Sequence, residues 1–290
     1  MGTQAYVEYW TDDARFGARG IDVVKNEFSR VNALMSPWVD SSELSQLNQF
    51  AATKPVTVSL ELYQLLQKAA SISKLSHGAF DITFASVGFS YDYRTGKKPD
   101  AKQLAQQKTL IDYRQVQLLP NTQVRFGKVG VKIDLGGIAK GYTVERAIHL
   151  LQQHGIKHAQ VSAGGDSRLL GDKRGKPWLV AIKHPRDDHR YAAQLPLSDS
   201  AISTSGDYER YFLDGDQRYH HILDPKTGKS ANRMMSVSVI GPDATTTDAL
   251  STTLFVLGLE QGLALIEQLP GYEAVFITAD RRLFYSKGLQ

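Results

Sequence analysis

The feature that most constrains the fold is a long series of short strand patterns that begins near residue 116. Apolar and β-branched residues predict strands at 116–119, 123–126, 131–134, 160–163, 178–182, 219–223, 235–240 and 275–278. Helical periodicity predicts helices at 138–153, before Gly155, and at about 246–257 and 259–268. Runs of strands with helices packed between them are typical of an α+β fold with mixed or antiparallel sheets, not of a doubly wound parallel sheet.

The first third of the chain is predicted to be more helical. Residues 3–9 alternate as a strand does, and 13–35 carry apolar residues mostly at three- and four-residue steps, as in an amphipathic helix. Ser41, Ser42 and Glu43 resemble a helix start, and 61–76 is a second clear helix. Residues 88–109 lack periodicity and are predicted to be an irregular surface excursion.

Length and composition exclude several classes of protein. With 290 residues, 42% of them hydrophobic, the chain can bury a large core as a single domain over 1–290, in the form of one large domain or of two interlocked lobes. The net charge of +4 is spread along the chain, so it favours a small anion only weakly and does not indicate nucleic acid. There are no cysteines, which excludes thiolate catalysis and Cys-ligated metals and fits a periplasmic protein.

Several common catalytic motifs are missing. Gly228-Lys229-Ser230 lacks the earlier glycine that a P-loop requires, because position 223 is Leu. No G-x-G-x-x-G follows a predicted strand, so a Rossmann nucleotide site is not indicated. G-x-S-x-G and H-E-x-x-H are also absent, which removes the serine-hydrolase elbow and the zincin helix.

One segment, Asp134 to Tyr142, has residues that suit an anionic ligand. A predicted strand turns through Gly136 and Gly137 into the start of a helix, where free amides favour anions, and Lys140 could add positive charge. The alternative is a plain strand-to-helix turn with a solvated lysine. These residues alone do not decide between the two.

Two further clusters have simple structural explanations. In Gly78 to Thr83, Phe80 is of a type more often found in a core, and Asp81 can cap the next segment. In the segment that ends at Gly164-Gly165-Asp166, a strand meets a glycine pair, which is typical of a hairpin turn. Taken singly, these patterns favour structural roles.

The last cluster suggests metal chemistry. If residues 246–257 are helical, Asp248 and Thr252 lie four apart on one face, where a carboxylate and a hydroxyl can both reach Mg²⁺. The alternative is that Thr246 or Thr247 caps this helix and Asp248 only complements its dipole. The preceding His221-Ile222-Leu223-Asp224-Pro225 ends in an ordinary turn, and His220 is expected to be structural or exposed.

In this order the motifs resemble those of one family across essentially the whole chain. The resemblance rests on Met1–Thr3, the segment from Ser41 to Asn48, Gly78 to Thr83, Asp134 to Tyr142, Gly164 to Asp166, Ser203 to Arg210, His221 to Pro225 and Asp248 to Thr252. These segments are similar to those of the FAD:protein FMN transferases, also called the ApbE family. Members of that family use FAD and Mg²⁺, transfer FMN to a Thr or Ser hydroxyl of a partner protein, and release AMP.

The resemblance implies roles for particular residues. The side chains of Asp248 and Thr252 would bind the metal, with the main-chain carbonyls of Ala139 and Ser251 as further ligands. His221 would be the catalytic base, and Asp224 would either orient it or only close the turn. The FAD site would be lined by Met1, Trp38, Ala79, Phe80, Asp81, Gly136, Tyr142 and Leu223.

The resemblance also implies partners and alternatives. The acceptor would be a flavoprotein subunit of a redox complex, such as the sodium-pumping NADH:quinone oxidoreductase. A Mg²⁺-dependent FAD pyrophosphatase giving FMN and AMP, or a non-enzymatic flavin-binding protein, are the other possible functions. We expect a periplasmic protein, lipid-anchored if its precursor carries an anchor that is removed here, rather than a cytoplasmic one. Where many members carry Pro and then Leu-Trp, this chain has the segment from Phe84 to Tyr93, so we expect its flavin-proximal loop to differ.

Overall fold

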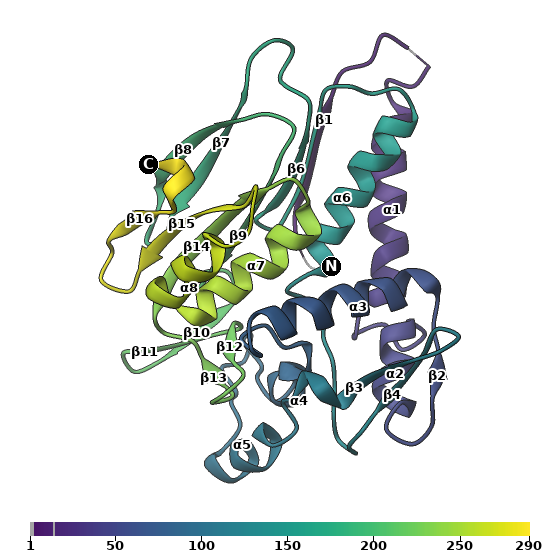
Figure 1. Cartoon of the computed structure of the whole chain (residues 1–290), viewed down its shortest axis with the longest axis vertical. Helices are drawn as coiled ribbons and strands as arrows, with labels where there is room; N and C mark the ends of the chain where they lie inside the picture. Colours follow the sequence, from purple (N-terminus) through teal and green to yellow (C-terminus); the bar gives the residue numbers. More distant parts are fainter. Residues whose placement is uncertain (1–2, 14) are drawn as a thin grey trace. The chain divides into compact units, whose positions relative to one another are not determined.

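The computed structural model describes residues 3–13 and 15–290, which form two compact units (Figure 1). Unit 1 comprises the described residues of Met1–Asn32, together with Ile138–Gly206 and Met234–Gln290. Unit 2 comprises Ala33–Gly137 and Asp207–Arg233. Each unit is therefore assembled from segments that are distant in the sequence. None of the helices in the described part of the chain is both long and apolar enough to cross a lipid bilayer.

A seven-stranded sheet forms the centre of unit 1, and all of its neighbouring strands run antiparallel. In order across the sheet the strands are β1 (Ala5–Tyr9), β5 (Ala159–Ala163), β6 (Asp166–Leu170), β9 (Ala201–Gly206), β14 (Met234–Gly241), β15 (Glu273–Thr278) and β16 (Leu283–Tyr285). On β14, an interior strand, Val237 lies opposite Ser205 on one side and Phe276 on the other. The predicted α+β class with mixed or antiparallel sheets is confirmed.

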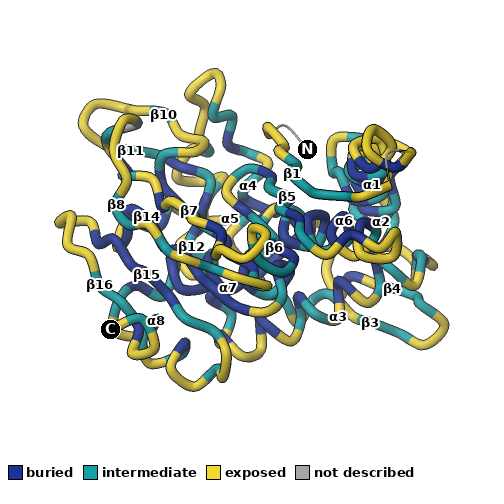
Figure 2. Tube along the Cα trace, turned by 90° about the horizontal axis from the view of Figure 1, so that it is seen from above, coloured by how far each residue is buried: buried dark blue, intermediate teal, exposed yellow. Residues whose placement is uncertain are grey.

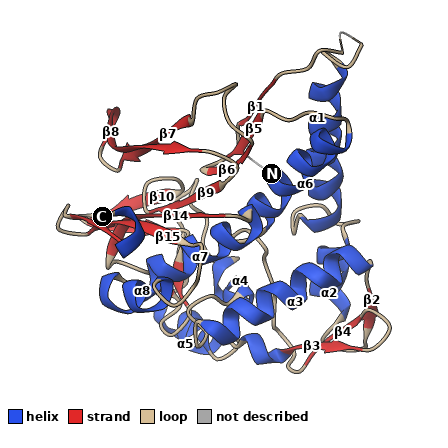
Figure 3. Cartoon of the chain, turned by 45° about the horizontal axis from the view of Figure 1, so that its top comes forward, coloured by secondary structure: helices blue, strands red, loops and turns tan. Residues whose placement is uncertain are grey.

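The two faces of this sheet are covered by different layers (Figure 3). Helices α1 (Arg19–Met35) and α6 (Ala139–Gln153) pack on one face, where Ala201 belongs to their core. The hairpin of β7 (Trp178–His184) and β8 (Asp187–Leu197) packs on the other face through Ile202. Consecutive residues of a strand point to opposite faces, so Ala201 faces one hydrophobic core and its neighbour Ile202 faces the other.

The middle of the sheet is buried on both sides, as the dark tube along β14 and β15 shows (Figure 2). All eight residues of β14 are buried, and Val237 and Val239 are fully inaccessible. Burying an aliphatic side chain of this size stabilises a fold by about 1.5–3 kcal/mol. Helices α7 (Ala244–Leu257) and α8 (Leu259–Ile266) follow β14 directly, and a 3₁₀ turn, η3 (Lys287–Leu289), ends the chain.

Unit 2 is built from short helices and small sheets. Ser42 caps α2 (Glu43–Phe50) by accepting the amide hydrogen of Ser45, and Ser59 caps α3 (Leu60–Leu75) by accepting that of Leu62. The helices are α2 (Glu43–Phe50), α3 (Leu60–Leu75), α4 (Ala85–Gly88) and α5 (Ala101–Lys108), with 3₁₀ turns η1 (Ile82–Phe84) and η2 (Tyr113–Gln115). The strands are β2 (Val56–Thr57), β3 (Val116–Leu119), β4 (Gln123–Phe126), β10 (Tyr211–Asp214), β11 (Gln217–His220), β12 (Leu223–Asp224) and β13 (Lys229–Ser230).

Three segments of unit 2 differ from what the sequence pattern indicates. Residues 131–134 are not a strand, because the side chain of Asn48 accepts the amide hydrogen of Ile133 at 2.7 Å and donates to its carbonyl at 2.9 Å. Residues 88–109, predicted as a surface excursion without periodicity, contain a helix that the sequence pattern missed: α5 has no buried residue, and a capping box formed by Asp100 and Gln103 starts it. The predicted strand 219–223 is interrupted between β11 and β12, where the amide of His221 donates a hydrogen bond to the carbonyl of Arg210.

Two predictions in unit 1 are corrected. The helix predicted at 13–35 begins at Arg19. Asp243, not Thr246 or Thr247, caps helix α7, because its carboxylate accepts the amide hydrogen of Thr245 at 2.8 Å. Asp248 therefore lies in the second turn of α7, so the interpretation that it only complements the helix dipole is wrong.

Helices α6 and α7 approach each other most closely at Gly141. A β-carbon on residue 141 would lie 2.1 Å from the carbonyl oxygen of Ala244 and 2.6 Å from the β-carbon of Asp248. Real atoms cannot approach so closely, and the Ala244 oxygen belongs to the backbone, so it cannot rotate away. The crossing of these two helices therefore requires glycine at this position.

We predict that Gly141→Ala lowers the free energy of unfolding by more than about 2 kcal/mol, as overpacking does in a well-packed core. Helix propensity alone predicts the opposite, because alanine is favoured over glycine by about 1 kcal/mol inside a helix. Gly155→Ala is the control: its β-carbon would meet no atom within 4 Å, and its φ of 80° adds only about 1–2 kcal/mol of backbone strain. Urea unfolding of both variants measures the difference, and a stabilised Gly141→Ala would contradict the prediction.

Candidate functional site

Helix α7 holds the predicted pair of Asp248 and Thr252 in unit 1. Its sequence makes a helix that is buried along most of its length, so Asp248 is almost inaccessible whereas Thr252 is partly exposed. The four-residue spacing places both side chains on the same face of the helix. The structure thus brings the predicted carboxylate and hydroxyl together.

Helix α6 meets α7 at the Asp248 side chain. Asp248 Oδ2 accepts the amide hydrogen of Gly141 at 2.9 Å, within the first turn of α6. Glu145, one turn further along α6, accepts the amide hydrogen of Ala244 at 2.7 Å through Oε2. A carboxylate near a helix N-terminus is stabilised by the unpaired amides there. Two contacts therefore fix the start of α7 against α6.

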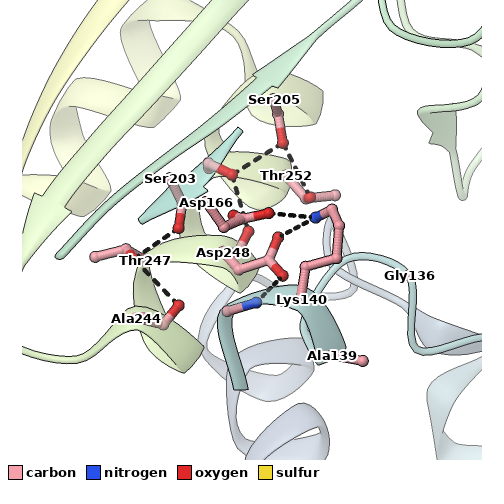
Figure 4. A network of polar contacts seen from close by, with 12 residues as sticks. Gly136, Ala139, Lys140, Asp166, Ser203, Ser205, Ala244, Thr247, Asp248 and Thr252 are labelled. Atoms are coloured by element: carbon pink, nitrogen blue, oxygen red, sulfur yellow. Dashed lines mark hydrogen bonds and ion pairs between the residues drawn. The ribbon is translucent and has the colours of Figure 1, made fainter. Parts of the chain in front are cut away.

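Lys140 extends from α6 between two acidic side chains (Figure 4). Its Nζ lies 2.6 Å from Asp166 Oδ2 and 3.2 Å from Asp248 Oδ1. Asp166 is the first residue of β6, after the two-residue turn at Gly164 and Gly165, whose positive φ angles suit glycine. The predicted hairpin turn is confirmed, and it delivers a buried carboxylate that sequence reasoning had assigned no role.

Burial and neighbouring charge shift the pKa values of this cluster. Burial is the largest influence on Asp166 and, with the nearby Asp248 carboxylate, raises its pKa to about 7, although Lys140 opposes the shift. Burial acts to lower the pKa of Lys140, but Asp166 and Asp248 together raise it well above its usual value. Lys140 is therefore a charged ammonium at neutral pH.

A network of hydroxyl groups joins α7 to the sheet (Figure 4). Ser205 Oγ lies 2.9 Å from Ser251 Oγ and 3.1 Å from Thr252 Oγ1, and Ser203 Oγ lies 2.8 Å from Thr247 Oγ1. Ser203 and Ser205 come from β9, next to β14 in the sheet. Sequence reasoning missed their role; the only signal was their place in the motif from Ser203 to Arg210.

The oxygen atoms of this cluster suit a hard cation. Magnesium prefers carboxylate, hydroxyl and carbonyl oxygens, and Asp248 and Thr252 supply the first two. Asp248 Oδ1 already lies beside a positively charged group, because the Lys140 ammonium is 3.2 Å from it. No group of three or more His, Cys, Asp or Glu side chains that could hold a metal occurs among residues 3–13 and 15–290.

The two predicted main-chain ligands have different surroundings. The carbonyl of Ala139, the first residue of α6, accepts the hydroxyl hydrogen of Thr143 at 2.6 Å. Ser251 lies inside α7, and its hydroxyl donates to the Asp248 carbonyl at 2.9 Å. A carbonyl has two lone pairs, so Ala139 can still accept one further contact. The metal-binding role of both residues remains a prediction.

The predicted catalytic residues lie in unit 2. His221 follows β11 and is partly buried, with its amide on the Arg210 carbonyl. His220 is buried, with Nε2 2.6 Å from the Ala231 carbonyl oxygen, so its predicted structural role is confirmed. Asp224 Oδ1 accepts the amide hydrogen of Lys226 at 2.8 Å, which closes the turn. Its role in orienting His221 stays a prediction.

The residues predicted to line the FAD site differ in their exposure. Trp38 is 75% exposed, and its ring packs edge-on against that of Phe89 with 5.4 Å between the ring centroids. Phe89 belongs to the segment from Phe84 to Tyr93, where this chain departs from many family members. Ala79, Phe80 and Leu223 are buried. Gly136 is exposed, Tyr142 is partly exposed, and Met1 lies outside the described residues. Their contact with FAD stays a prediction.

Asp81 has a clear structural role in unit 2. One carboxylate oxygen accepts the amide of Thr83 at 2.8 Å and its hydroxyl at 2.6 Å, and the other accepts the amide of Tyr113 at 2.8 Å. It thereby caps η1, as the sequence had allowed. Burial raises the pKa of Asp81 to about 6, because desolvation outweighs these hydrogen bonds.

We predict that Asp81→Asn lowers the free energy of unfolding by about 1–3 kcal/mol. The Asn side chain has only one acceptor oxygen, so its NH₂ group would face the Tyr113 N–H, and two hydrogen-bond donors would meet without an acceptor. Because the folded-state pKa of Asp81 lies above its unfolded value, its titration adds stability below pH 4 that is lost as pH rises towards 6. The loss caused by Asp81→Asn should therefore be larger at pH 5 than at pH 7.5. Thermal melts at both pH values measure this effect; a larger loss at pH 7.5 would contradict it. Asp92→Asn, at a partly exposed turn, is the control and should cost little.

Comparison with known proteins agrees with this geometry. The family model described as "ApbE family" matches residues 1–276. The FAD:protein FMN transferase of Treponema pallidum is 36% identical over 274 residues, covering 86% of this chain and 74% of that protein. The FAD:protein FMN transferase of Vibrio cholerae is 33% identical, with 92% of this chain and 82% of that protein covered. The crystal structure of the ApbE protein from Thermotoga maritima superposes with a TM-score of 0.90 at 33% identity, covering 99% of this chain and 95% of that one. With most of its length matched in sequence and fold, this chain belongs to the ApbE family.

Proposed function

We propose that this chain is a transferase that moves FMN from FAD to a Thr or Ser hydroxyl of an acceptor protein and releases AMP. The observation that carries the proposal is that Asp248 contacts the start of α6 and Thr252 contacts Ser205 of β9, inside a chain of the ApbE family. Relatives at 28–36% identity over most of the chain are named FAD:protein FMN transferase. An enzyme of this type must bind a pyrophosphate and stabilise the charge that develops on it.

The proposed cofactor is Mg²⁺, held by the side chains of Asp248 and Thr252 and by the main-chain carbonyls of Ala139 and Ser251. Bound magnesium would neutralise charge on phosphate oxygens and stabilise the AMP leaving group. Asp248 supplies the anion, and Ser205 restrains the Thr252 hydroxyl at 3.1 Å. The residues of the cluster therefore fit a hard cation in charge and in donor type.

The proposed roles of the remaining residues follow from the chemistry. The acceptor hydroxyl forms a bond to the FMN phosphorus as the bond from that phosphorus to AMP breaks. A hydroxyl is a poor nucleophile near neutral pH, so His221 is proposed to accept its proton, a contribution of about 10²–10⁴-fold. Asp224 is proposed to orient His221. Trp38, Ala79, Phe80, Asp81, Gly136, Tyr142 and Leu223 are proposed to line the FAD site, together with Met1.

The proposed acceptor is a flavoprotein subunit of a redox complex, and the proposed location is the periplasm. The absence of cysteine from all 290 residues is compatible with an oxidising, extracytoplasmic compartment, because the chain has no thiol that could form a non-native disulfide there. Cell fractionation with antibody detection tests the location. A protein found only in the cytoplasmic fraction would refute it.

The first experiment incubates the protein with FAD and Mg²⁺, with and without a candidate acceptor domain that carries the target Thr. AMP release is measured by chromatography and the acceptor by mass spectrometry. An acceptor that gains one FMN supports the transferase. FMN and AMP without a gain in acceptor mass favour the pyrophosphatase or a wrong acceptor, and intact FAD leaves only a binding protein.

Asp248→Asn should lower the Mg²⁺-dependent rate at least about a hundredfold, since the amide oxygen still accepts from Gly141 but carries no charge for the metal. Asp243→Asn is the matched control. It removes a carboxylate from the start of the same helix, but asparagine caps a helix as well as aspartate does, so its rate should stay close to wild type. A wild-type rate for Asp248→Asn would refute the metal assignment.

His221→Ala should lower FMN transfer at least about a hundredfold while FAD binding, measured by fluorescence titration, stays nearly intact. His220→Ala serves as the contrast. It removes the contact with the Ala231 carbonyl in a buried position, so it should lower the melting temperature instead. Unchanged transfer in a folded His221→Ala variant would remove His221 from the mechanism.

A further inference from the structure

The oxygen atoms of Asp248 are not equally available to a metal. Oδ2 accepts the Gly141 amide hydrogen at 2.9 Å, a contact fixed by the crossing of α6 and α7. Oδ1 faces Lys140 Nζ at 3.2 Å. A cation that binds Oδ1 leaves the Gly141 contact on Oδ2 undisturbed, and at Oδ1 it meets an ammonium group already in place.

Asp166 is the other acidic partner of Lys140. Its Oδ2 lies 2.6 Å from Lys140 Nζ, closer than the Asp248 oxygen, and its side chain is 1% exposed. The hairpin turn at Gly164 and Gly165 and the pairing of β6 with β9 hold Asp166 in place. The mechanism proposed above uses neither the Asp166 carboxylate nor its contact with Lys140.

The charges of the three side chains do not balance. When both carboxyl groups are ionised, Asp166 and Asp248 contribute two negative charges and Lys140 one positive charge, all within one cluster. Two buried carboxylates without a counter-ion would be strongly destabilising, because an unpaired buried charge is costly. Lys140 therefore stabilises the cluster when no metal is bound, and one negative charge remains to attract a divalent cation.

We propose that Lys140 is an internal counter-ion that occupies Asp248 before the metal arrives, and that Asp166 is a positioning residue that retains Lys140 when the metal displaces it. This inference rests on the Mg²⁺ site proposed above. The long, flexible lysine side chain can leave Asp248 Oδ1 without losing its shorter contact with Asp166. The ammonium then stays beside the metal as a second positive charge for an anionic substrate.

The test measures Mg²⁺ binding without FAD, so it does not depend on turnover. Isothermal titration calorimetry gives Kd, and thermal melts without metal report the stability of the cluster. Lys140→Met keeps an unbranched side chain of nearly the same length but removes its charge. We expect its melting temperature without metal to fall and its Mg²⁺ affinity to rise at least about tenfold, because the competing ammonium is gone. Lys157→Met, an exposed lysine just beyond α6, should change neither value.

The role of Asp166 is tested by a double-mutant cycle. Asp166→Asn alone should weaken Mg²⁺ binding at least about tenfold, because Lys140 then pairs only with Asp248. In the Lys140→Met background the same substitution should have a much smaller effect, since Asp166 acts through Lys140. An equal loss in both backgrounds would show that Asp166 acts on the metal directly and would overturn its assignment.

The outcomes separate this inference from the proposed function. Absence of Mg²⁺ binding to the wild-type protein refutes the proposed metal site itself. Wild-type affinity in Lys140→Met, with the wild-type protein binding Mg²⁺, refutes only the counter-ion role. If Lys140→Met does not fold, Asp166→Asn alone still decides, because wild-type affinity in that variant overturns the proposal.

Discussion

The amide of Gly141 donates to the carboxylate of Asp248, and this contact is possible only because residue 141 has no side chain. Helices α6 and α7 can then cross at a distance that would force any other residue into the Ala244 backbone. Glu145 adds a second contact from α6 to the start of α7. One short distance thus sets where the carboxylate, the lysine and the hydroxyl of the candidate metal site lie relative to each other.

The antiparallel sheet of unit 1 supplies the rest of that cluster. The hairpin between β5 and β6 delivers Asp166, and β9 delivers Ser203 and Ser205 to the side of α7. Because the sheet is buried on both faces, these polar groups have little access to water and must satisfy one another. Hydrogen bonds and charge pairs in such surroundings are stronger than at a surface, and leaving one unmade costs more.

The motifs that identify the family combine structural and chemical residues. His220 and His221 are adjacent, yet His220 is anchored to the Ala231 carbonyl in the interior whereas His221 is only partly buried. Asp81 caps a 3₁₀ turn with one carboxylate oxygen and accepts the Tyr113 amide hydrogen with the other, so its place in a motif is explained by folding without reference to a ligand. A residue's presence in a family motif is therefore not evidence of its chemical role until its contacts are known.

The sequence by itself determined the α+β class, the long periodic helices, the two-glycine hairpin and the spacing of Asp248 and Thr252, because these features depend on local periodicity and turn chemistry. It also identified the family through the order of its motifs. The sequence was misleading at 131–134. There the backbone of Ile133 bonds to the side chain of Asn48, which is 85 residues away in the sequence, and not to a neighbouring strand. Only the tertiary structure decided that Lys140 lies between Asp166 and Asp248 and that Ser205 contacts Thr252. The reason is that these contacts join three or four separate elements, and no local pattern encodes the distance between elements that meet only when the sheet and helices pack.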